Sequence, residues 1–192
     1  MAYLLDRIKE SLQKEGLPAR SIKSRDWIRT KVQNLNSTPR SLMSDKQRLK
    51  NDTVIGKLYF YSYNPKTKDK MKYYDKFPLV IPLEMYNDGF LGLNLHYIHP
   101  KQRLLLLDKL SEYATNDKYD KTTKLRLSYS LLKSAAKVYE MQACIKRYLY
   151  TNIESRFLEV PADEWDIAAL LPYENFVGAR PSQVFSDSRE KF

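Results

Sequence analysis

The clearest pattern of hydrophobic and polar positions lies in the middle of the chain, where apolar runs alternate with short polar stretches. Residues 58–63 are rich in aromatic side chains, a polar stretch follows at 64–70, and a second apolar run extends through 73–85. Aromatic runs favour strands, and the polar stretch between them favours a turn. Residues 87–89, Asn-Asp-Gly, predict a tight hairpin turn with positive φ angles, and the alternation at 90–98 predicts the next strand. This region therefore predicts a meander of three or four antiparallel strands.

The segments on either side of this sheet show helical periodicity, with apolar residues three or four positions apart. Ser24 is the expected N-cap of the second helix. The predicted helices are 3–15, 25–35, 101–114, 122–136 and 138–153.

The C-terminal part of the chain predicts shorter elements. Residues 157–161 indicate a short strand, and 161–165 indicate a one-turn helix that begins with proline. The apolar run at 167–171 predicts a strand that returns to the central sheet. Beyond 178 the composition is polar and predicts a mobile tail, for which Val184 and Phe185 are the expected anchors.

Together these elements predict an α+β fold. Its small antiparallel sheet is expected to be SH3-like, a partly open barrel, flanked by N-terminal helices and a C-terminal helical segment. We expect a helical, basic N-terminal arm at 1–50, a single α+β domain at 51–178 and a tail at 179–192. Within the arm and just beyond it, 40–53 is polar and basic, which predicts an extended or loosely ordered segment.

The distribution of charge along the chain gives a first indication of function. The 192 residues carry a formal net charge of +10, and nine basic against two acidic residues place +7 of it within 19–50. Such an excess favours a polyanion or an acidic protein surface as partner. The basic segment fits a phosphate-contacting arm and, equally, a solvated or subunit-binding segment. The expected nucleic-acid contacts are Arg25, Arg29, Lys31, Arg40, Lys46, Arg48, Lys50, Lys66, Lys68 and Lys70.

The chain is also rich in tyrosine, with 15 residues, many of them in the predicted sheet. Alternation places Tyr59, Tyr61 and Tyr63 on one face. A row of tyrosines beside lysines can stack nucleic-acid bases, and it can also form a protein interface, where tyrosine is enriched. We favour the interface, with Tyr59, Tyr61, Tyr63, Tyr73 and Tyr74 as its expected residues.

Few residues suggest catalytic chemistry. The two histidines, His96 and His99, are expected to be structural, and the single Cys144 rules out an internal disulfide and a cysteine-based zinc site. No common catalytic or phosphate-loop motif is present. We therefore predict no enzyme activity, catalytic residue, metal or cofactor. A nuclease site would need convergence of the carboxylates Asp69, Asp75, Glu84 and Asp88.

Neither a membrane helix nor a signal peptide is expected, because no apolar run approaches ~20 residues and charges interrupt the N-terminus at Asp6 and Arg7. The composition instead favours a soluble protein made inside the cell.

Two blocks carry a family resemblance. YYDKFPLVIP at 73–82 and GFLGLNLHY at 89–97 resemble a recurrent signature of large contractile-tailed bacteriophages, and 56–66 and 164–172 fit its flanking segments. The chain is thus similar to the virion DNA end-protector family of these myoviruses, a head-completion factor. The resemblance implies a protein that sits on the ends of the packaged genome and shields them from host exonuclease.

These observations lead to one expected function and one alternative. The expected function is a non-enzymatic virion protein that binds double-stranded DNA ends during head completion. The alternative is a structural neck, tail or baseplate component that uses its basic arm and tyrosines to bind other virion proteins. Both place the protein in the virion after synthesis in the host bacterial cytoplasm, with no membrane partner and with homo-oligomerisation left open.

Overall fold

The structure is a computed structural model of the chain. It describes residues 3–114 and 143–190 and, between these ranges, residues 117, 118, 120, 123, 130, 131 and 134. Most of the helix predicted at 122–136 therefore lies outside the described residues. No helix in the described part of the chain is long and apolar enough to cross a membrane.

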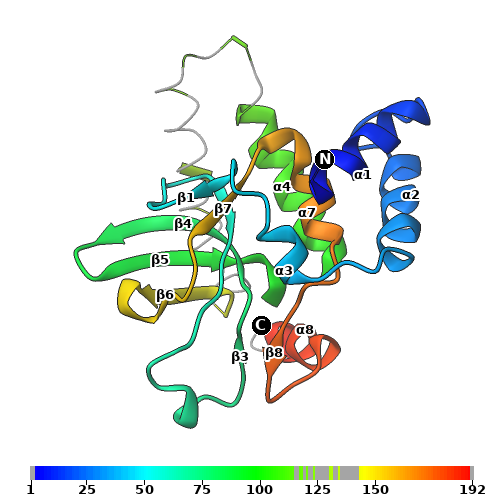
Figure 1. Cartoon of the computed structure of the whole chain (residues 1–192). Helices are drawn as coiled ribbons and strands as arrows, with labels where there is room; N and C mark the ends of the chain where they lie inside the picture. Colours follow the sequence, from blue (N-terminus) through cyan, green and yellow to red (C-terminus); the bar gives the residue numbers. More distant parts are fainter. Residues whose placement is uncertain are drawn as a thin grey trace.

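The centre of the fold is a six-stranded sheet in which every paired strand is antiparallel (Figure 1). Its order is β1-β7-β2-β4-β5-β6, and β3 and β8 form a separate two-stranded ladder. The strands are β1 (Leu49–Lys50), β2 (Leu58–Phe60), β3 (Tyr74–Asp75), β4 (Leu79–Tyr86), β5 (Gly89–Asn94), β6 (Ile145–Leu149), β7 (Phe157–Val160) and β8 (Phe176–Val177).

The predicted hairpin is confirmed, because β4 and β5 pair with only Asn87 and Asp88 between them. The expected positive φ angles are wrong, since none of these turn residues nor Gly89 adopts one. Glycine is needed at 89 for a different reason. A Cβ there would lie 1.9 Å from the backbone oxygen of Tyr148, where β6 pairs closely with β5.

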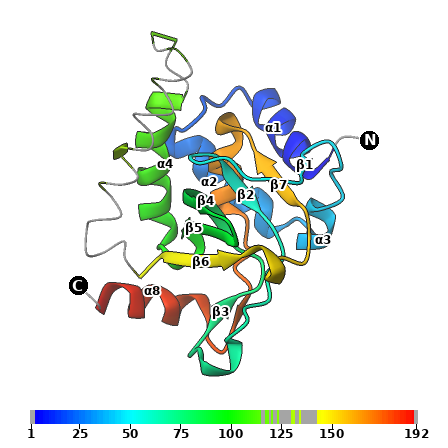
Figure 2. The ribbon, with the colours of Figure 1, turned by 90° about the vertical axis from the view of Figure 1, so that its left-hand side faces the viewer.

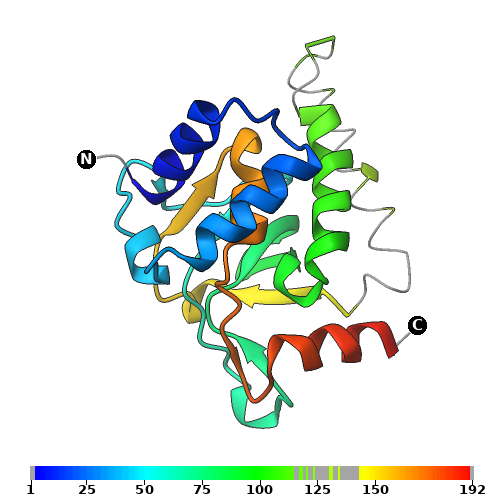
Figure 3. The same ribbon diagram turned by 90° about the vertical axis from the view of Figure 1, so that its right-hand side faces the viewer.

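Helices cover one face of the sheet, as seen in Figure 3, where α1, α2 and α4 lie in front of the strands. Helix α7 lies beneath them and is buried on nearly every side, with Ile167, Ala168 and Ala169 at most 2% exposed. The α-helices are α1 (Leu4–Lys14), α2 (Ile22–Gln33), α3 (Pro39–Leu42), α4 (Pro100–Ala114), α7 (Trp165–Leu170) and α8 (Pro181–Glu190). The 3₁₀ turns are η1 (Lys68–Lys70), η2 (Leu95–Tyr97), η3 (Tyr150–Asn152) and η4 (Ala162–Glu164).

Several predicted elements are confirmed and others are wrong. The helices at 3–15 and 101–114 and the strand at 157–161 exist with nearly the expected bounds. The second helix begins earlier, since Ser21 and not Ser24 accepts the capping hydrogen bond. Residues 145–153, expected in a helix, form β6 and η3, because β6 completes the sheet edge beside β5.

The C-terminal part needs two further corrections. Residues 167–170 belong to helix α7, with Leu171 as its C-cap, and not to a strand, because a short apolar run fits a buried helix as well as a buried strand. The expected tail contains helix α8, in which Val184 is fully buried, as its predicted role as an anchor requires.

Residues 40–53 are not an extended arm, since they contain α3 and β1 and bury Leu42 and Asp45. Strand β1 pairs with β7, so this segment forms one edge of the sheet. The mixed fold with a mainly antiparallel sheet is as predicted, and its division at residues 50 and 178 stays a prediction.

The face of the sheet opposite the helices encloses a second, aromatic core. Its members are Tyr59, Tyr61, Tyr63, Val80, Phe90, Tyr148 and Phe157. The ring of Tyr61, just after β2, lies 5.5 Å from Tyr148 on β6 and 5.1 Å from Phe157 on β7. In a flat sheet β6 would stand three strand spacings of about 4.8 Å from β2. The sheet therefore curls around these rings.

This aromatic core predicts sensitivity to alkali. Burial raises the pKa of Tyr61 and Tyr148 well above the ordinary value of 10.0. In the unfolded chain these groups ionise near pH 10, so above that pH the folded state binds more protons and loses stability as pH rises. An alkaline titration should show tyrosinate absorbance from these rings appearing together with loss of near-UV circular dichroism. Full ionisation with the dichroism intact would contradict their burial.

Candidate nucleic-acid interface

Two of the predicted DNA-contacting arginines are engaged inside the protein. Arg25 on α2 binds Asp108 of α4 at 2.5 Å and Asp166 of α7 at 3.0 Å, and its side chain is 14% exposed. Burial lowers its pKa, but the hydrogen bonds to these two carboxylates outweigh that and raise the pKa above its ordinary value. Arg25 therefore joins three helices and has little capacity left for a phosphate.

Arg48 stands at the centre of a larger ion-pair network. Its guanidinium contacts Asp6 at 2.5 Å, Asp45 at 2.7 Å and Glu164 at 2.5 Å. Lys9 approaches the same Glu164 carboxylate at 3.6 Å. These contacts fasten α1 and the segment before β1 to η4, so Arg48 stabilises the attachment of the N-terminal segment.

The remaining predicted contacts in the N-terminal segment are exposed or partly exposed, but they lie in two places. Arg29, paired with Asp26, and Lys31, 5.7 Å from the Trp27 ring, are on α2, behind the sheet in Figure 2. The other three follow the course of the chain from α3 to β1 and have no ion pair with a carboxylate of the described residues. They are Arg40, Lys46 and Lys50.

The loop that carries η1 projects from the end of the molecule opposite α1, near β6 (Figure 2). Lys66, Lys68 and Lys70 are all exposed on it, and within the described chain none of them pairs with a carboxylate. Lys68 donates a hydrogen bond to the side-chain oxygen of Asn64 at 3.2 Å. These lysines therefore keep most of their charge available to a partner.

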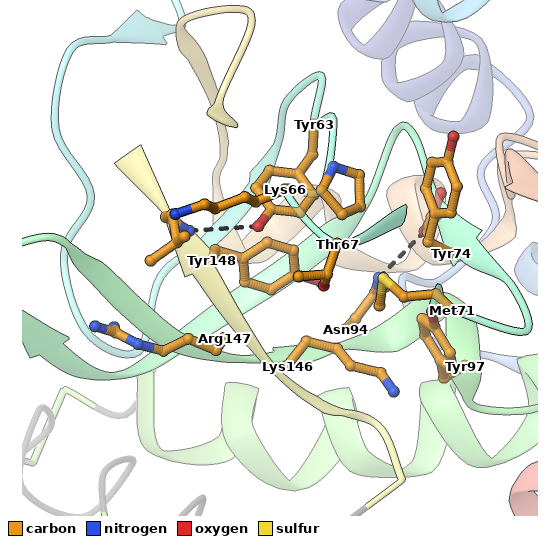
Figure 4. Close-up of a pocket in the computed structure, with 13 residues that line it drawn as sticks. Tyr63, Lys66, Thr67, Met71, Tyr74, Asn94, Tyr97, Lys146, Arg147 and Tyr148 are labelled. Carbon is orange, nitrogen blue, oxygen red and sulfur yellow. Dashed lines mark hydrogen bonds between the residues drawn. The ribbon is translucent and has the colours of Figure 1, made fainter. Parts of the chain in front are cut away.

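A pocket of about 340 Å³ opens beside this loop (Figure 4). We call it the η1 pocket. The loop, β6, β5 and η2 contribute to it, and β6 adds Lys146 and Arg147, which lie within the range predicted as a helix at 138–153. The nitrogen of Lys146 lies 4.4 Å from the centre of the Tyr97 ring, and Arg147 pairs with Asp88.

The inner end of the η1 pocket contains a hydrogen-bonded polar cluster centred on Asp75. The Asp75 carboxylate accepts from the side chains of His96 at 2.7 Å and Asn94 at 3.2 Å. It also accepts from the backbone N–H groups of Phe77 and Asn175. His96 is fully buried, so the cluster acts as a structural link between β3, η2 and the segment before β8.

The four carboxylates considered for a nuclease are separated by these roles. Asp75 is buried in the cluster, whereas Asp88 pairs with Arg147 at the tip of the β4–β5 hairpin. Asp69 lies on η1 and Glu84 is exposed on β4. Among the described residues, no group of three His, Cys, Asp or Glu side chains is arranged to hold a metal ion.

The tyrosines predicted as an interface divide into two sets. Tyr59, Tyr61 and Tyr63 are at most 6% exposed and belong to the aromatic core. Of these three, only Tyr63 reaches a cavity, as one wall of the η1 pocket. Tyr73 and Tyr74 are partly exposed, and Tyr74 lines the η1 pocket. Period-2 alternation correctly placed Tyr59, Tyr61 and Tyr63 on one face of the sheet. It could not show that the sheet curls over that face.

Comparison with known proteins supplies the family. No curated protein and no solved structure matches the chain. A family model described as the phage T4 terminal DNA protecting protein matches residues 3–189, nearly the full length. The match extends beyond the 56–172 region of the sequence resemblance and includes both the N-terminal segment and α8. The chain belongs to the phage T4 terminal DNA protecting protein family.

Proposed function

We propose that the protein protects the ends of packaged phage DNA by covering them, with the exposed lysines of the η1 loop holding the phosphates. DNA end protection by a virion protein is the function of the family. The neck, tail or baseplate alternative is not favoured, and the burial of Tyr59, Tyr61 and Tyr63 removes most of the interface on which it relied.

The observation that carries this proposal is the availability of Lys66, Lys68 and Lys70. They are exposed, close in sequence and without carboxylate partners in the described structure. Lysine acts toward phosphate as a point charge and reads no base, so contacts of this kind suit an end of any sequence. Arg40, Lys46 and Lys50 form a second candidate contact along the α3–β1 segment.

Protection in this proposal is steric and non-enzymatic. A protein bound over the terminus occupies the space that an exonuclease needs in order to engage the strand. Synthesis in the host cytoplasm, binding to other virion proteins and homo-oligomerisation are further parts of the proposal. An SH3-like, partly open barrel is the finer description that we propose for the curled sheet.

A competition experiment tests the proposal. Labelled linear duplex bound to the wild-type protein is competed with unlabelled linear DNA and with closed circular DNA of the same sequence. We expect linear DNA to compete better, and we expect binding to weaken steeply between about 50 mM and about 200 mM salt. The same complexes, treated with a processive exonuclease, should be digested more slowly than free DNA.

Two results would count against the proposal. Equal competition by circles would reduce it to general DNA affinity. The absence of any binding near physiological salt would remove the DNA contact altogether.

A further inference from the structure

The charge of the η1 loop accounts for phosphate binding, but it does not account for the η1 pocket beside the loop. Its volume of about 340 Å³ falls within the range of small-molecule sites, which begins at about 300 Å³. It lies between the lysine-rich loop and β6, next to the residues that we propose to hold phosphates (Figure 4). A strand that is held by the loop therefore passes the mouth of a cavity of nucleotide size.

The walls of the pocket are aromatic and apolar. Tyr63 and Tyr148 line one part, Tyr74 and Tyr97 line another, and Met71 lies between the loop and Tyr97 (Figure 4). Aromatic side chains bind nucleobases by stacking, and they do so with little sequence preference because every base has a π-face. Such walls suit a base of any identity.

Positive charge lies at the edge of the pocket. Lys66 lines it from the loop, is exposed and has no ion pair with a described carboxylate. Lys146 lines it from β6, with its nitrogen over the Tyr97 ring. The stem of Arg147 also lines it, although its guanidinium reaches away to Asp88. A phosphate therefore fits at the edge, next to Lys66.

The polar cluster at the inner end of the pocket offers few free groups that could read the identity of a base. Asp75 already accepts four hydrogen bonds, and the Asn94 amide is committed to Asp75 and to the His96 backbone N–H. These groups have few remaining sites for a base edge, and without such hydrogen bonds there is no direct readout of sequence. The Asp75 charge also keeps phosphate away from the inner end.

From these observations we propose that the η1 pocket takes the last nucleotide of a DNA strand, with its base inside and its phosphate at Lys66. This inference rests on the proposed function and deepens it. A base inside a duplex is paired and stacked on both sides, so it must be extruded at a cost of a few kcal/mol before it can enter. A terminal base stacks on one side only. Extruding a terminal base therefore costs less, and the pocket predicts tighter binding to DNA ends than to closed circles.

The first test changes the DNA and leaves the protein intact. Blunt duplexes that lack the terminal base at their 5′ ends, or at their 3′ ends, are compared with the complete duplex by fluorescence anisotropy. We expect one of the two abasic duplexes to bind about tenfold more weakly, the order expected for losing one stacked base. A terminal mismatch should bind more tightly than a paired end, because less unpairing is needed. Equal affinity for all four duplexes would overturn the inference.

The second test fills the pocket. Thr67 lines it and is exposed, so Thr67→Trp adds an aromatic ring there without disturbing the core, and Thr30→Trp on α2 is the matched control. We expect Thr67→Trp to lose the preference for linear over circular DNA and to keep its affinity for circles, whereas Thr30→Trp keeps both. Retention of the linear preference in Thr67→Trp would contradict the pocket.

The outcomes separate the two proposals. If the wild-type protein binds no DNA, the proposed function itself fails. If it prefers ends but ignores terminal abasic sites and Thr67→Trp, the function stands and only the pocket inference fails.

Discussion

Replacing Arg48 with methionine is expected to lower the free energy of unfolding by about 3–5 kcal/mol, the usual cost of removing one partner from a buried ion pair. Methionine retains much of the apolar stem but leaves Glu164 and Asp45 without their cation. Their side chains are 2% and 4% exposed, so water cannot solvate these charges. Lys9 contacts Glu164 only at 3.6 Å and compensates in part. Against a typical stability of about 5–15 kcal/mol, this is a large loss.

Urea denaturation followed by far-UV circular dichroism measures this effect. The matched control is Lys46→Met, because Lys46 is an exposed neighbour with no ion pair to a described carboxylate, and its replacement should change stability by less than about 0.5 kcal/mol. Adding Glu164→Gln to Arg48→Met removes one stranded charge and should restore part of the lost stability. A wild-type denaturation midpoint for Arg48→Met would show that the network contributes little.

This prediction bears on how DNA binding is assigned. Arg48 holds α1 and the segment before β1 against η4. A substitution at this position therefore destabilises the fold, whatever its effect on a DNA contact. The same argument applies to Arg25, which joins α2 to α4 and α7. Loss of DNA binding in either variant would therefore not identify a phosphate contact, whereas the exposed lysines can be changed with little effect on stability.

The parts of the fold that the sequence predicts well are those set by local signals. Asn87 and Asp88 between two apolar runs specify the β4–β5 hairpin, and the spacing of Leu104, Leu107 and Leu110 specifies α4, where all three are buried. The wrong predictions concern segments whose secondary structure depends on contacts with residues far away in the sequence. Residues 145–149 fit a helix by spacing, but pairing with β5 makes them a strand. Residues 167–170 fit a strand, but burial under α1, α2 and α4 makes them a helix.

The candidate site shows the same limit in its electrostatics. The excess of +7 in 19–50 is a property of the sequence, but it does not reveal which cations are neutralised. The acids that occupy Arg25 lie 83 and 141 residues away, and Glu164 lies 116 residues from Arg48. No local pattern contains that information. The loop lysines were predicted as DNA contacts from the sequence, and the fold adds the η1 pocket, which Lys66 and Lys146 both line.

The largest effect on DNA binding is expected from the combined change Lys66→Glu, Lys68→Glu and Lys70→Glu. Each lysine that neutralises a phosphate releases a counterion, so losing three should reduce the slope of log affinity against log salt by about 2.7. At about 50 mM salt the affinity for linear duplex should fall on the order of a hundredfold, and the reversed charges add repulsion. Filter binding or anisotropy across a salt series measures both quantities, and the urea midpoint should stay close to wild type because all three side chains are exposed.

The control variant carries the same total change of charge on another part of the surface. Lys23→Glu, Lys101→Glu and Lys109→Glu lie on the exposed surface of α2 and α4, on the helical side of the sheet. If only net charge matters, both triple variants weaken binding equally and the η1 loop is not the contact. If the α3–β1 segment is the contact instead, Arg40→Glu, Lys46→Glu and Lys50→Glu gives the larger loss of slope. A full loss confined to the η1 variant identifies the loop as the phosphate-binding surface. There Lys66, Lys68 and Lys70 lie beside the η1 pocket and pair with no carboxylate of the described residues.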